Sequence, residues 1–391
     1  MPTEARPRVA VVCDLREENW HSMNLVADVL VEGTRNGGGR GVETARLCPP
    51  MRRRLTRRGA ASGALFNADR LLNRFWDYPR WVRRRGRDFD LFHVVDHSYA
   101  QLLHELPAGR TVVTCHDLDT FRSVLEPARE RRSPLFRAMT RRVLEGFRKA
   151  ARVACVSAAT RDELLAHGLF PPERLRVIPN GLHPAYTRPV GARALREAER
   201  LLGAEDGGRP ELLHVGSTAE RKRVDVLLKV FAEVRRAWPR ARLVRVGGLT
   251  PEQAALAKAL KLGDGLIVLP YLEPEVLAAV YGRAALVLLP SEREGFGLPA
   301  AEALVCGTPV VASRLAVLRE VGGDEAVEYC AVGDVREWGE TVVRLLAERE
   351  AAPGRWEARR AAGRSRASVF TRERYVAETV ALYREVLEDN F

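Results

Sequence analysis

Short apolar stretches alternate with helix-like stretches along almost the whole chain, and this alternation is the strongest constraint on its fold. Continuous apolar runs of about four to eight residues are typical of strands buried on both faces of a parallel sheet. A first set of strands is expected at residues 9–13, 42–47, 91–95, 111–114, 153–156 and 176–178. A second set is expected at residues 212–215, 243–246, 266–269, 286–289 and 310–312, with intervening helices such as 24–31, 224–237 and 252–260. The sequence therefore predicts an α/β protein with two doubly wound parallel sheets, each with ligand sites beyond the carboxyl ends of its strands.

The two sets of strands are separated by Pro179, Asn180 and Gly181, a turn-forming sequence that is typical of a linker. The chain has 391 residues, 46% of them hydrophobic, which is enough for two cores of ordinary size. We therefore expect domains at residues 1–183 and 184–391. Residues 372–388 have the apolar period of an amphipathic helix, and residues 196–210 are expected to form a loop insertion.

Positive charge is concentrated in the N-terminal half. Residues 1–180 hold 32 Lys and Arg against 21 Asp and Glu, net +11, whereas residues 181–391 are net +1. The arginines cluster at residues 52–58, 80–87 and 129–142, and Trp76, Tyr78 and Trp81 interleave with the second cluster. Such a face suits contact with an anionic membrane surface, an acidic acceptor or nucleic acid. The alternative is an arginine-rich face that is only solvated. No motif of a nucleic-acid-binding domain is present, so no nucleic-acid partner is expected.

The cysteines and the hydropathy indicate a reducing compartment. The six cysteines are scattered without a Cys-x-x-Cys pair, which argues against a disulfide framework and a zinc site. Nowhere do about 18 apolar residues follow one another, and the start of the chain lacks the pattern of a signal peptide. We expect a cytoplasmic protein.

Within residues 290–313, the carboxylates of Glu294 and Glu302 are separated by seven residues across a glycine-rich turn. Gly295 and Gly297 allow a tight turn after the apolar run that ends at residue 289, and Pro299 suits the first turn of a helix. Free backbone N–H groups and both carboxylates can then face one anionic ligand at a helix N-terminus. The alternative is a plain strand–loop–helix in which Glu302 only offsets the helix dipole.

This segment resembles the Glu-x7-Glu signature of retaining glycosyltransferases of family 4. The resemblance implies the GT-B fold, in which two Rossmann-like domains face a central cleft and the last helix crosses back to the N-terminal domain. Residues 1–183 would then bind the acceptor, and residues 184–391 the nucleotide-sugar donor. It also implies that Glu294 contacts the donor sugar and Glu302 the nucleotide ribose. Further donor contacts are expected from the same turn, at Gly295, Phe296, Gly297 and Leu298.

A second stretch, Gly216 to Arg223, resembles the diphosphate site of the same family. It follows an expected strand and precedes an apolar helix, and it carries Arg221 and Lys222, which can offset the charge of a departing nucleotide. Taken alone, such a basic triplet is typical of a solvated face, and Arg223 is expected to be peripheral. Gly216 and Ser217 are expected at the donor, although Ser217 stands where some members have a basic residue. Backbone groups near Gly247, Gly248, Tyr271 and Leu272 are expected to hold the base.

The N-terminal half supplies a third group. His116 follows the strand at 111–114. The family often has a histidine at this position, close to the donor sugar and the acceptor. By this resemblance we expect a catalytic role for His116, together with Glu294, Arg221 and Lys222. By the alternative interpretation His116 is a packed strand-end residue. The acceptor-side candidates are Trp20, His21, Asp96 and His97. Asp117 and Asp119 mimic the metal-binding Asp-x-Asp of GT-A enzymes, but no GT-A layout accompanies them.

The resemblance therefore implies transfer of a sugar from a nucleotide-diphosphate sugar to an acceptor hydroxyl with retention, without a cofactor or a metal. The alternatives are a GT-B sugar-nucleotide epimerase and a basic nucleic-acid-binding protein. The acceptor is expected to be lipid-linked or anionic, with peripheral contact of the basic N-terminal domain at the inner membrane face. Many members have a glycine pair after the first strand, whereas this chain has residues 16–24 without glycine, so the acceptor cannot be assigned by analogy.

Overall fold

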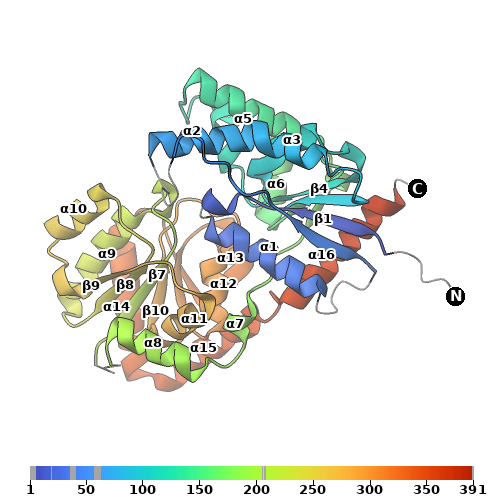
Figure 1. The fold of residues 1–391 in the computed structure, drawn as a ribbon. Helices are drawn as coiled ribbons and strands as arrows, with labels where there is room; N and C mark the ends of the chain where they lie inside the picture. The colour runs from blue at the N-terminus through green and yellow to red at the C-terminus, as the bar shows by residue number, and fades with distance from the viewer. Residues whose placement is uncertain are drawn as a thin grey trace. The chain divides into compact units, whose positions relative to one another are not determined.

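A computed structural model of the chain describes residues 6–18, 20–35, 41–56, 63–204, 206 and 208–389. These residues form two compact units (Figure 1). Unit 1 consists of Met1–Gly181 and Thr371–Phe391, and unit 2 of Leu182–Phe370. The division thus lies close to the boundary expected after residue 183, and the last segment of the chain belongs to unit 1.

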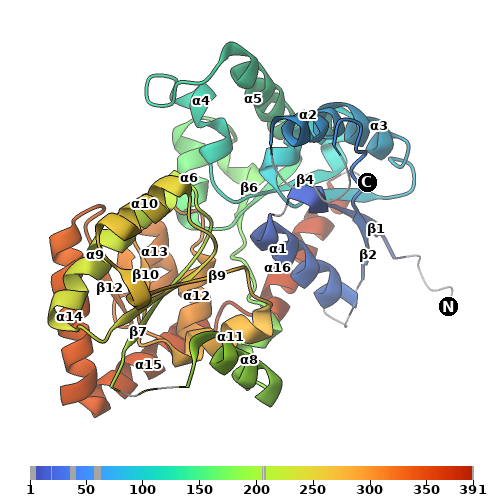
Figure 2. The ribbon, with the colours of Figure 1, turned by 60° about the vertical axis from the view of Figure 1, so that its left-hand side comes forward.

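Unit 1 contains a six-stranded parallel sheet in the order β2-β1-β3-β4-β5-β6. Its strands are β1 (Arg8–Val12), β2 (Glu43–Leu47), β3 (Leu91–Val94), β4 (Thr111–Cys115), β5 (Arg152–Cys155) and β6 (Leu175–Val177). Its helices are α1 (His21–Gly33), α2 (Ala64–Leu72), α3 (Tyr78–Arg83), α4 (Arg122–Leu125), α5 (Pro134–Phe147), α6 (Ala158–Ala166) and α16 (Arg372–Glu388). Helices α1 and α16 lie on one side of the sheet, and α2, α3 and α5 lie on the other (Figures 1 and 2). All six predicted strands of this set are confirmed to within a residue or so at their ends.

Unit 2 also contains a six-stranded parallel sheet, in the order β12-β11-β10-β7-β8-β9. Its strands are β7 (Glu211–Val215), β8 (Arg242–Val246), β9 (Leu266–Leu269), β10 (Leu286–Leu289), β11 (Val310–Ser313) and β12 (Val327–Cys330). Its helices are α7 (Pro184–Thr187), α8 (Ala192–Leu202), α9 (Val224–Ala237), α10 (Pro251–Ala259), α11 (Pro274–Arg283), α12 (Leu298–Val305), α13 (Ala316–Gly322), α14 (Val335–Ala351) and α15 (Pro353–Ala367). Leucine, valine and phenylalanine side chains of α9 and α14 pack with those of the sheet to form its main core. The prediction of two doubly wound α/β domains is therefore confirmed.

Two local predictions were wrong or incomplete. Residues 196–210 do not begin as a loop, because α8 continues to Leu202 and buries Ala194, Ala198 and Leu202 at four-residue spacing. Small alanines among many charged residues gave this helix a weak apolar signal. Strand β12 was not predicted, because it is the edge strand of its sheet and its Glu328 interrupts the apolar run.

Helix α16 completes unit 1. Its buried residues include the five that the sequence pattern indicated: Tyr375, Val376, Val380, Tyr383 and Leu387. The backbone of α1 approaches it so closely that a Cβ on Gly33 would lie 2.5 Å from Cγ2 of Val376. The Tyr383 hydroxyl hydrogen-bonds Nδ1 of His93 in β3 at 2.6 Å, and Nε2 of His93 hydrogen-bonds the Thr114 hydroxyl at 2.7 Å. Burial lowers the pKa of His93 to about 3, so its ring stays neutral between these partners.

We expect Tyr383→Phe to destabilise the chain by about 1–3 kcal/mol, because the change leaves a buried ring nitrogen of His93 without its partner. Tyr375→Phe is the matched control: Tyr375 is also buried on α16, and its hydroxyl has no hydrogen-bond partner within the described structure. Urea unfolding of both variants measures the difference. Equal losses of stability in the two variants would show that the Tyr383–His93 bond contributes nothing.

Candidate active site

The sheet of unit 2 reverses its direction of winding between β7 and β10. From β7 the chain adds β8 and β9 on one side, and it then returns to add β10, β11 and β12 on the other. The loops that leave the carboxyl ends of β7 and β10 therefore lie next to each other, which is where open α/β sheets bind ligands. These are the loops at residues 216–223 and 290–297, the two that the sequence singled out.

A charged contact joins the two loops. Nζ of Lys222 lies 2.6 Å from Oε1 of Glu294, and the Ser291 hydroxyl donates to the same oxygen at 2.7 Å. Nη1 of Arg221 lies 3.6 Å from Oε2 of Glu294. The Lys222 residue is 9% exposed, so this lysine is not part of a solvated face. Arg223, by contrast, pairs with its neighbour Asp225.

The two glutamates differ in their electrostatics. Burial alone would raise the pKa of Glu294, but the charges of Lys222 and Arg221 and the hydrogen bonds from Lys222 and Ser291 outweigh it and lower the pKa. Glu302, on α12, has no cation beside it among the described residues and is 5% exposed. Burial raises its pKa to about 7, although the hydroxyls of Tyr281 and Tyr186 donate hydrogen bonds that lower it. Oε2 of Glu302 accepts from the Tyr281 hydroxyl at 2.8 Å.

Gly297 allows the chain to turn from β10 into α12. Its φ is +90°, and a Cβ there would lie 2.6 Å from Cδ2 of Leu318. Leu298 begins α12 and Pro299 follows in its first turn. Gly295 and Phe296 are buried just before, and the Phe296 ring packs edge-on against Phe370 at 5.3 Å.

The loops after β7 and β8 also touch. Gly247 has a φ of +112°, and a Cβ there would lie 2.2 Å from the carbonyl oxygen of Gly216. Gly248 follows in the same loop. Tyr271 and Leu272 lie beyond β9, and of these Tyr271 is half-exposed and Leu272 is buried. The backbone of Gly247, one of the predicted base-binding residues, therefore lies against Gly216, the first residue of the predicted diphosphate stretch.

The sheet of unit 1 has a corresponding reversal, between β1 and β3. Val12 of β1 pairs with Val94 of β3, so Asp14 and Asp96, each a little further along, leave the sheet side by side. Burial first, and then the negative charge of Asp96, raise the pKa of Asp14. The pKa of Asp96 is lowered in spite of burial, by the neighbouring His97 and His116 and by the backbone N–H of Ser98, which donates to Oδ1 of Asp96 at 2.7 Å. The two carboxyl groups therefore titrate as a coupled pair, in which Asp14 binds its proton more tightly than Asp96.

Two histidines lie beside this carboxyl pair. Nε2 of His116 donates to the carbonyl oxygen of Val95 at 2.8 Å, which leaves the lone pair on Nδ1. Burial lowers the pKa of His116, so the ring is neutral. The backbone N–H of His116 donates to Nδ1 of His97 at 3.3 Å, and Nε2 of His97 lies 3.7 Å from Asp117. The structure thus brings His116, Asp96 and His97 together.

The other acceptor-side candidates lie at the start of α1. Trp20 is half-exposed, and its indole N–H donates to Oε2 of Glu18 at 2.9 Å. The side chain of His21 is outside the described part of the structure. Asp119 accepts a hydrogen bond from Arg122 at 2.8 Å, so one member of the Asp-x-Asp pair holds a cationic side chain.

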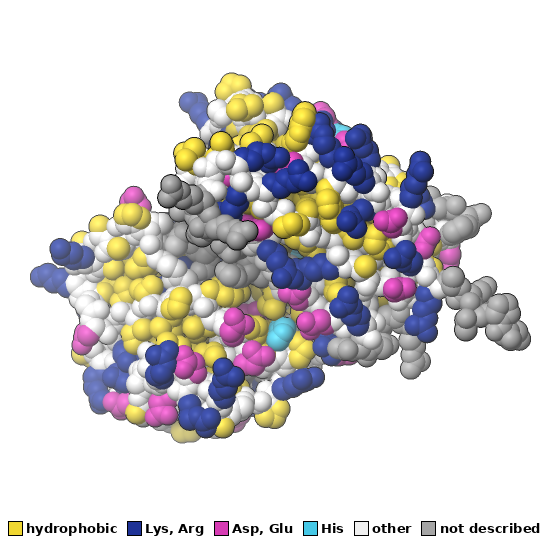
Figure 3. Space-filling model, viewed as in Figure 1, with side chains coloured by type: hydrophobic (Ala, Val, Ile, Leu, Met, Phe, Trp, Pro, Cys, Tyr) yellow, Lys and Arg dark blue, Asp and Glu magenta, His cyan; other side chains and the backbone are white. Residues whose placement is uncertain are grey.

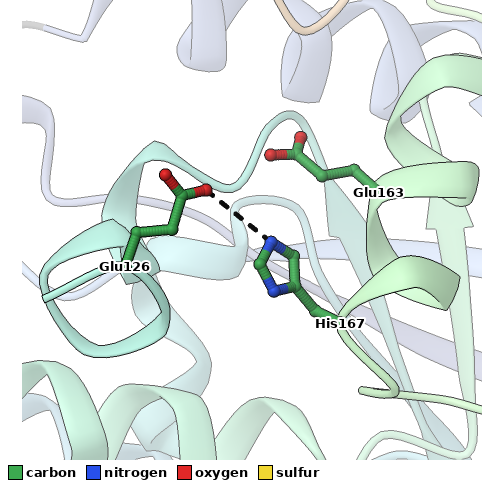
Figure 4. Close-up of side chains that lie close together, drawn as sticks. All are labelled: Glu126, Glu163 and His167. Carbon is green, nitrogen blue, oxygen red and sulfur yellow. Dashed lines mark ion pairs between the residues drawn. The ribbon is translucent and has the colours of Figure 1, made fainter. Parts of the chain in front are cut away.

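One group of three side chains in the described ranges has the spacing of metal ligands: Glu126, Glu163 and His167 (Figure 4). The guanidinium of Arg122 lies 3.0 Å from Glu126 and 2.9 Å from Glu163. Arg122 therefore already forms an ion pair with each of these carboxylates, and no metal is assigned to this group. That the protein needs no metal stays a prediction.

Sequence reasoning missed several residues of these sites. The sequence does indicate a site residue at Asp14, since an acidic residue directly follows an apolar strand there. That Asp14 lies beside Asp96 follows only from the strand order. Ser291 and Tyr281 are common residues in ordinary surroundings, and only the structure places them on Glu294 and Glu302.

Known proteins match the chain over most of its length. Residues 196–362 match the family model "Glycosyl transferases group 1", and residues 29–186 match the model "Glycosyltransferase Family 4". An MMP alpha-(1->4)-mannosyltransferase of Mycolicibacterium hassiacum is 30% identical over 320 residues, 78% of this chain and 72% of that protein. The chain belongs to glycosyltransferase family 4. A D-inositol 3-phosphate glycosyltransferase of Segniliparus rotundus is 36% identical over 223 residues. This match covers 55% of the family 4 chain and 48% of the length of that relative.

Solved structures show that this glycosyltransferase-family chain has the GT-B fold. Sucrose-phosphate synthase of Thermosynechococcus elongatus matches with a TM-score of 0.77 at 20% identity, over 98% of this chain and 100% of that one. HepE of Anabaena, solved with UDP and glucose, matches with a TM-score of 0.71 at 14% identity, over 96% of this chain and 98% of that one. Within the described residues, no helix of the family 4 chain has the length and apolarity needed to cross a bilayer.

Glu302 gives a pH-dependent prediction. Its folded-state pKa, about 7, is above the ordinary value of 4.5, so it contributes stability at low pH that is lost as the pH rises through 7. Glu302→Gln removes this loss. The free energy of unfolding of the variant, relative to that of the wild type, should therefore rise by up to about 3 kcal/mol from pH 5 to pH 8. Denaturant unfolding at both pH values tests it, with the exposed Glu350→Gln as the control. A pH-independent difference between variant and wild type would contradict the raised pKa.

Proposed function

We propose that the chain transfers a sugar from a nucleoside-diphosphate sugar to an acceptor hydroxyl, with retention at the anomeric carbon. The observation that carries the proposal is the Lys222–Glu294 contact, which places a cation and a carboxylate at the β7/β10 reversal of a family 4 chain. The names of both curated relatives and the UDP and glucose in HepE support it. Because the match with the first relative spans about half of that protein's length, its activity comes to this chain only as a proposal.

Unit 2 holds the donor in this proposal. Arg221, Lys222 and the N–H groups around Gly297 bind the diphosphate, and Glu302 accepts hydrogen bonds from the ribose. Glu294 contacts the sugar. The base lies against the backbone at Gly248 and Tyr271. No cofactor and no metal takes part, since the cationic side chains offset the charge that develops on the diphosphate.

Transfer breaks the bond from the anomeric carbon to the diphosphate oxygen and forms a bond to the acceptor oxygen on the same face. The departing phosphate oxygen takes the proton of the incoming hydroxyl, so no side chain acts as nucleophile. The acceptor-side residues of unit 1 are His116, Asp96, His97, Trp20 and His21. A carboxylate at Asp96 and a neutral imidazole lone pair at His116 accept hydrogen bonds from hydroxyl groups of the acceptor or the sugar.

Substitution of Lys222 tests the donor site. Lys222→Met keeps the aliphatic stem but removes the charge, and turnover should fall roughly a hundredfold or more, the effect expected for loss of one group that stabilises developing charge. Arg223→Met is the matched control, because Arg223 is adjacent in sequence but pairs with Asp225. Product formation from UDP- and GDP-sugars, followed with an acceptor panel, is the measurement, and circular dichroism checks that both variants fold.

The same assay separates the alternatives. NMR of the new glycosidic bond should show the donor's anomeric configuration, and EDTA should leave the rate unchanged. Conversion of free nucleotide sugar without transfer would identify an epimerase instead. Equal activity of Lys222→Met and the wild type would remove Lys222 from the mechanism.

The basic face of unit 1 suits peripheral membrane contact, through which the enzyme would reach a lipid-linked or anionic acceptor at the cytoplasmic side. The helical stretch from α2 to α3 exposes Leu65, Leu72 and Trp76, each between 43% and 59% exposed. Arg80 stacks on Trp76, and the Arg83 side chain is 65% exposed. Figure 3 shows Lys and Arg side chains gathered among hydrophobic ones over α2, α3 and α5. Tyr78 does not belong to this surface, because its hydroxyl is buried against the carbonyls of Cys13 and Leu47.

Sedimentation with liposomes tests this contact. We expect binding to anionic but not neutral vesicles, lost at high salt, since each basic residue near an anionic leaflet contributes about 1 kcal/mol. Changing Arg83, Arg84 and Arg85 to Glu should abolish it. The matched triple change at exposed arginines of α8, at Arg193, Arg196 and Arg200, should leave binding intact. Equal recovery of all proteins in the supernatant would leave Arg83, Arg84 and Arg85 as a solvated face.

A further inference from the structure

A buried arginine lies under the loops of the proposed donor site. Arg245 is in β8, and its register partner in β7 is His214. Both side chains are 0% exposed. Nη2 of Arg245 donates to the carbonyl oxygen of Ser217 at 2.9 Å, and Nη1 donates to the carbonyl oxygen of Val246. The guanidinium therefore connects the end of β8 to the Gly216–Ser217 turn that follows β7.

No carboxylate within the described residues pairs with this guanidinium, and its Nε–H has no hydrogen-bond partner there. Burial lowers the pKa of Arg245 only to about 10, so the side chain stays charged at neutral pH. His214 supplies no counter-charge, since an imidazole is either neutral or cationic; burial and the neighbouring charges of Arg245 and Lys222 lower its pKa and keep it neutral. A buried charge without a counter-charge is costly, which makes an anionic ligand the natural partner.

The charges around the Gly216–Ser217 turn also favour an anionic ligand. Three cations, Arg221, Lys222 and Arg245, contact Glu294 or the Gly216–Ser217 turn, and Glu294 is the carboxylate among them. The excess of two positive charges matches the two negative charges of a sugar-linked nucleoside diphosphate. Arg245 also supports the neighbouring loop, since a Cβ on Gly247 would lie 2.8 Å from Nη1.

We propose that Arg245 is a positioning residue for the donor: it fixes the Gly216–Ser217 turn and supplies a buried positive charge to the diphosphate that binds there. The inference rests on the proposed function, because the diphosphate is the donor's. It predicts that the contribution of Arg245 to binding affinity grows with the number of phosphates on the ligand. A purely structural role would weaken the nucleoside and the diphosphate alike.

Calorimetry with a nucleoside, its monophosphate and its diphosphate measures this pattern. UDP, GDP and ADP are first screened on the wild-type chain to choose the base. Arg245→Met should weaken diphosphate binding about tenfold or more but nucleoside binding less than about twofold. Arg245→Lys should keep most of the affinity for the diphosphate, because it keeps the positive charge. Arg242→Met is the matched control on the same strand, since the Arg242 guanidinium is paired with Glu211.

Arg245→Gln, which keeps hydrogen-bond donors without the charge, repeats the comparison if the methionine variant does not fold. Equal weakening of nucleoside and diphosphate, or unchanged diphosphate affinity in the glutamine variant, would overturn the role of Arg245 while leaving the proposed function standing. Failure of all three diphosphates to bind the wild-type chain would instead overturn the proposed function, and this inference with it.

Discussion

Parallel pairing of β7 with β10 is the constraint on which the proposed donor site depends. It brings together two loops that are 72 residues apart in the chain, so that Lys222 reaches Glu294. A parallel sheet needs a crossover between neighbouring strands, so every loop that leaves a carboxyl end opens at the same edge. The lack of a Cβ at Gly247 and Gly297 then lets the chain pack closely there, against the carbonyl oxygen of Gly216 and against Leu318 respectively.

Within this site, burial has opposite consequences for the two glutamates. Glu294 is buried beside cations, which keep it ionised, whereas Glu302 is buried among tyrosine hydroxyls, which do not fully offset the cost of burying a charge. The same contrast appears in unit 1, where burial raises the pKa of Asp14 and the neighbouring histidines lower that of Asp96. Each unit thus combines one carboxylate that is charged and ready to accept hydrogen bonds with one carboxyl group that titrates at higher pH.

The sequence predicted most of the fold because strands of a doubly covered parallel sheet are short apolar runs, and such runs are easily seen. It could not predict the edge strand β12 or the alanine-faced helix α8, whose burial depends on neighbours rather than on a strong apolar pattern. The motif around Glu294 and Glu302 was visible because its parts are close in the chain. The positions of Asp14, Tyr281 and Arg245 relative to their partners follow from strand order and helix packing, which a single sequence does not contain.

The return of α16 to unit 1 has a consequence for how the protein is made. The sheet of unit 1 leaves the ribosome before any of unit 2, but the helix that covers it comes after Phe370. At synthesis rates of about 5–20 residues per second, unit 2 delays that helix by roughly ten to forty seconds. During this interval the apolar side of α1 lacks its partner and is open to chaperones. The length of unit 2 therefore sets the time at which unit 1 can finish folding.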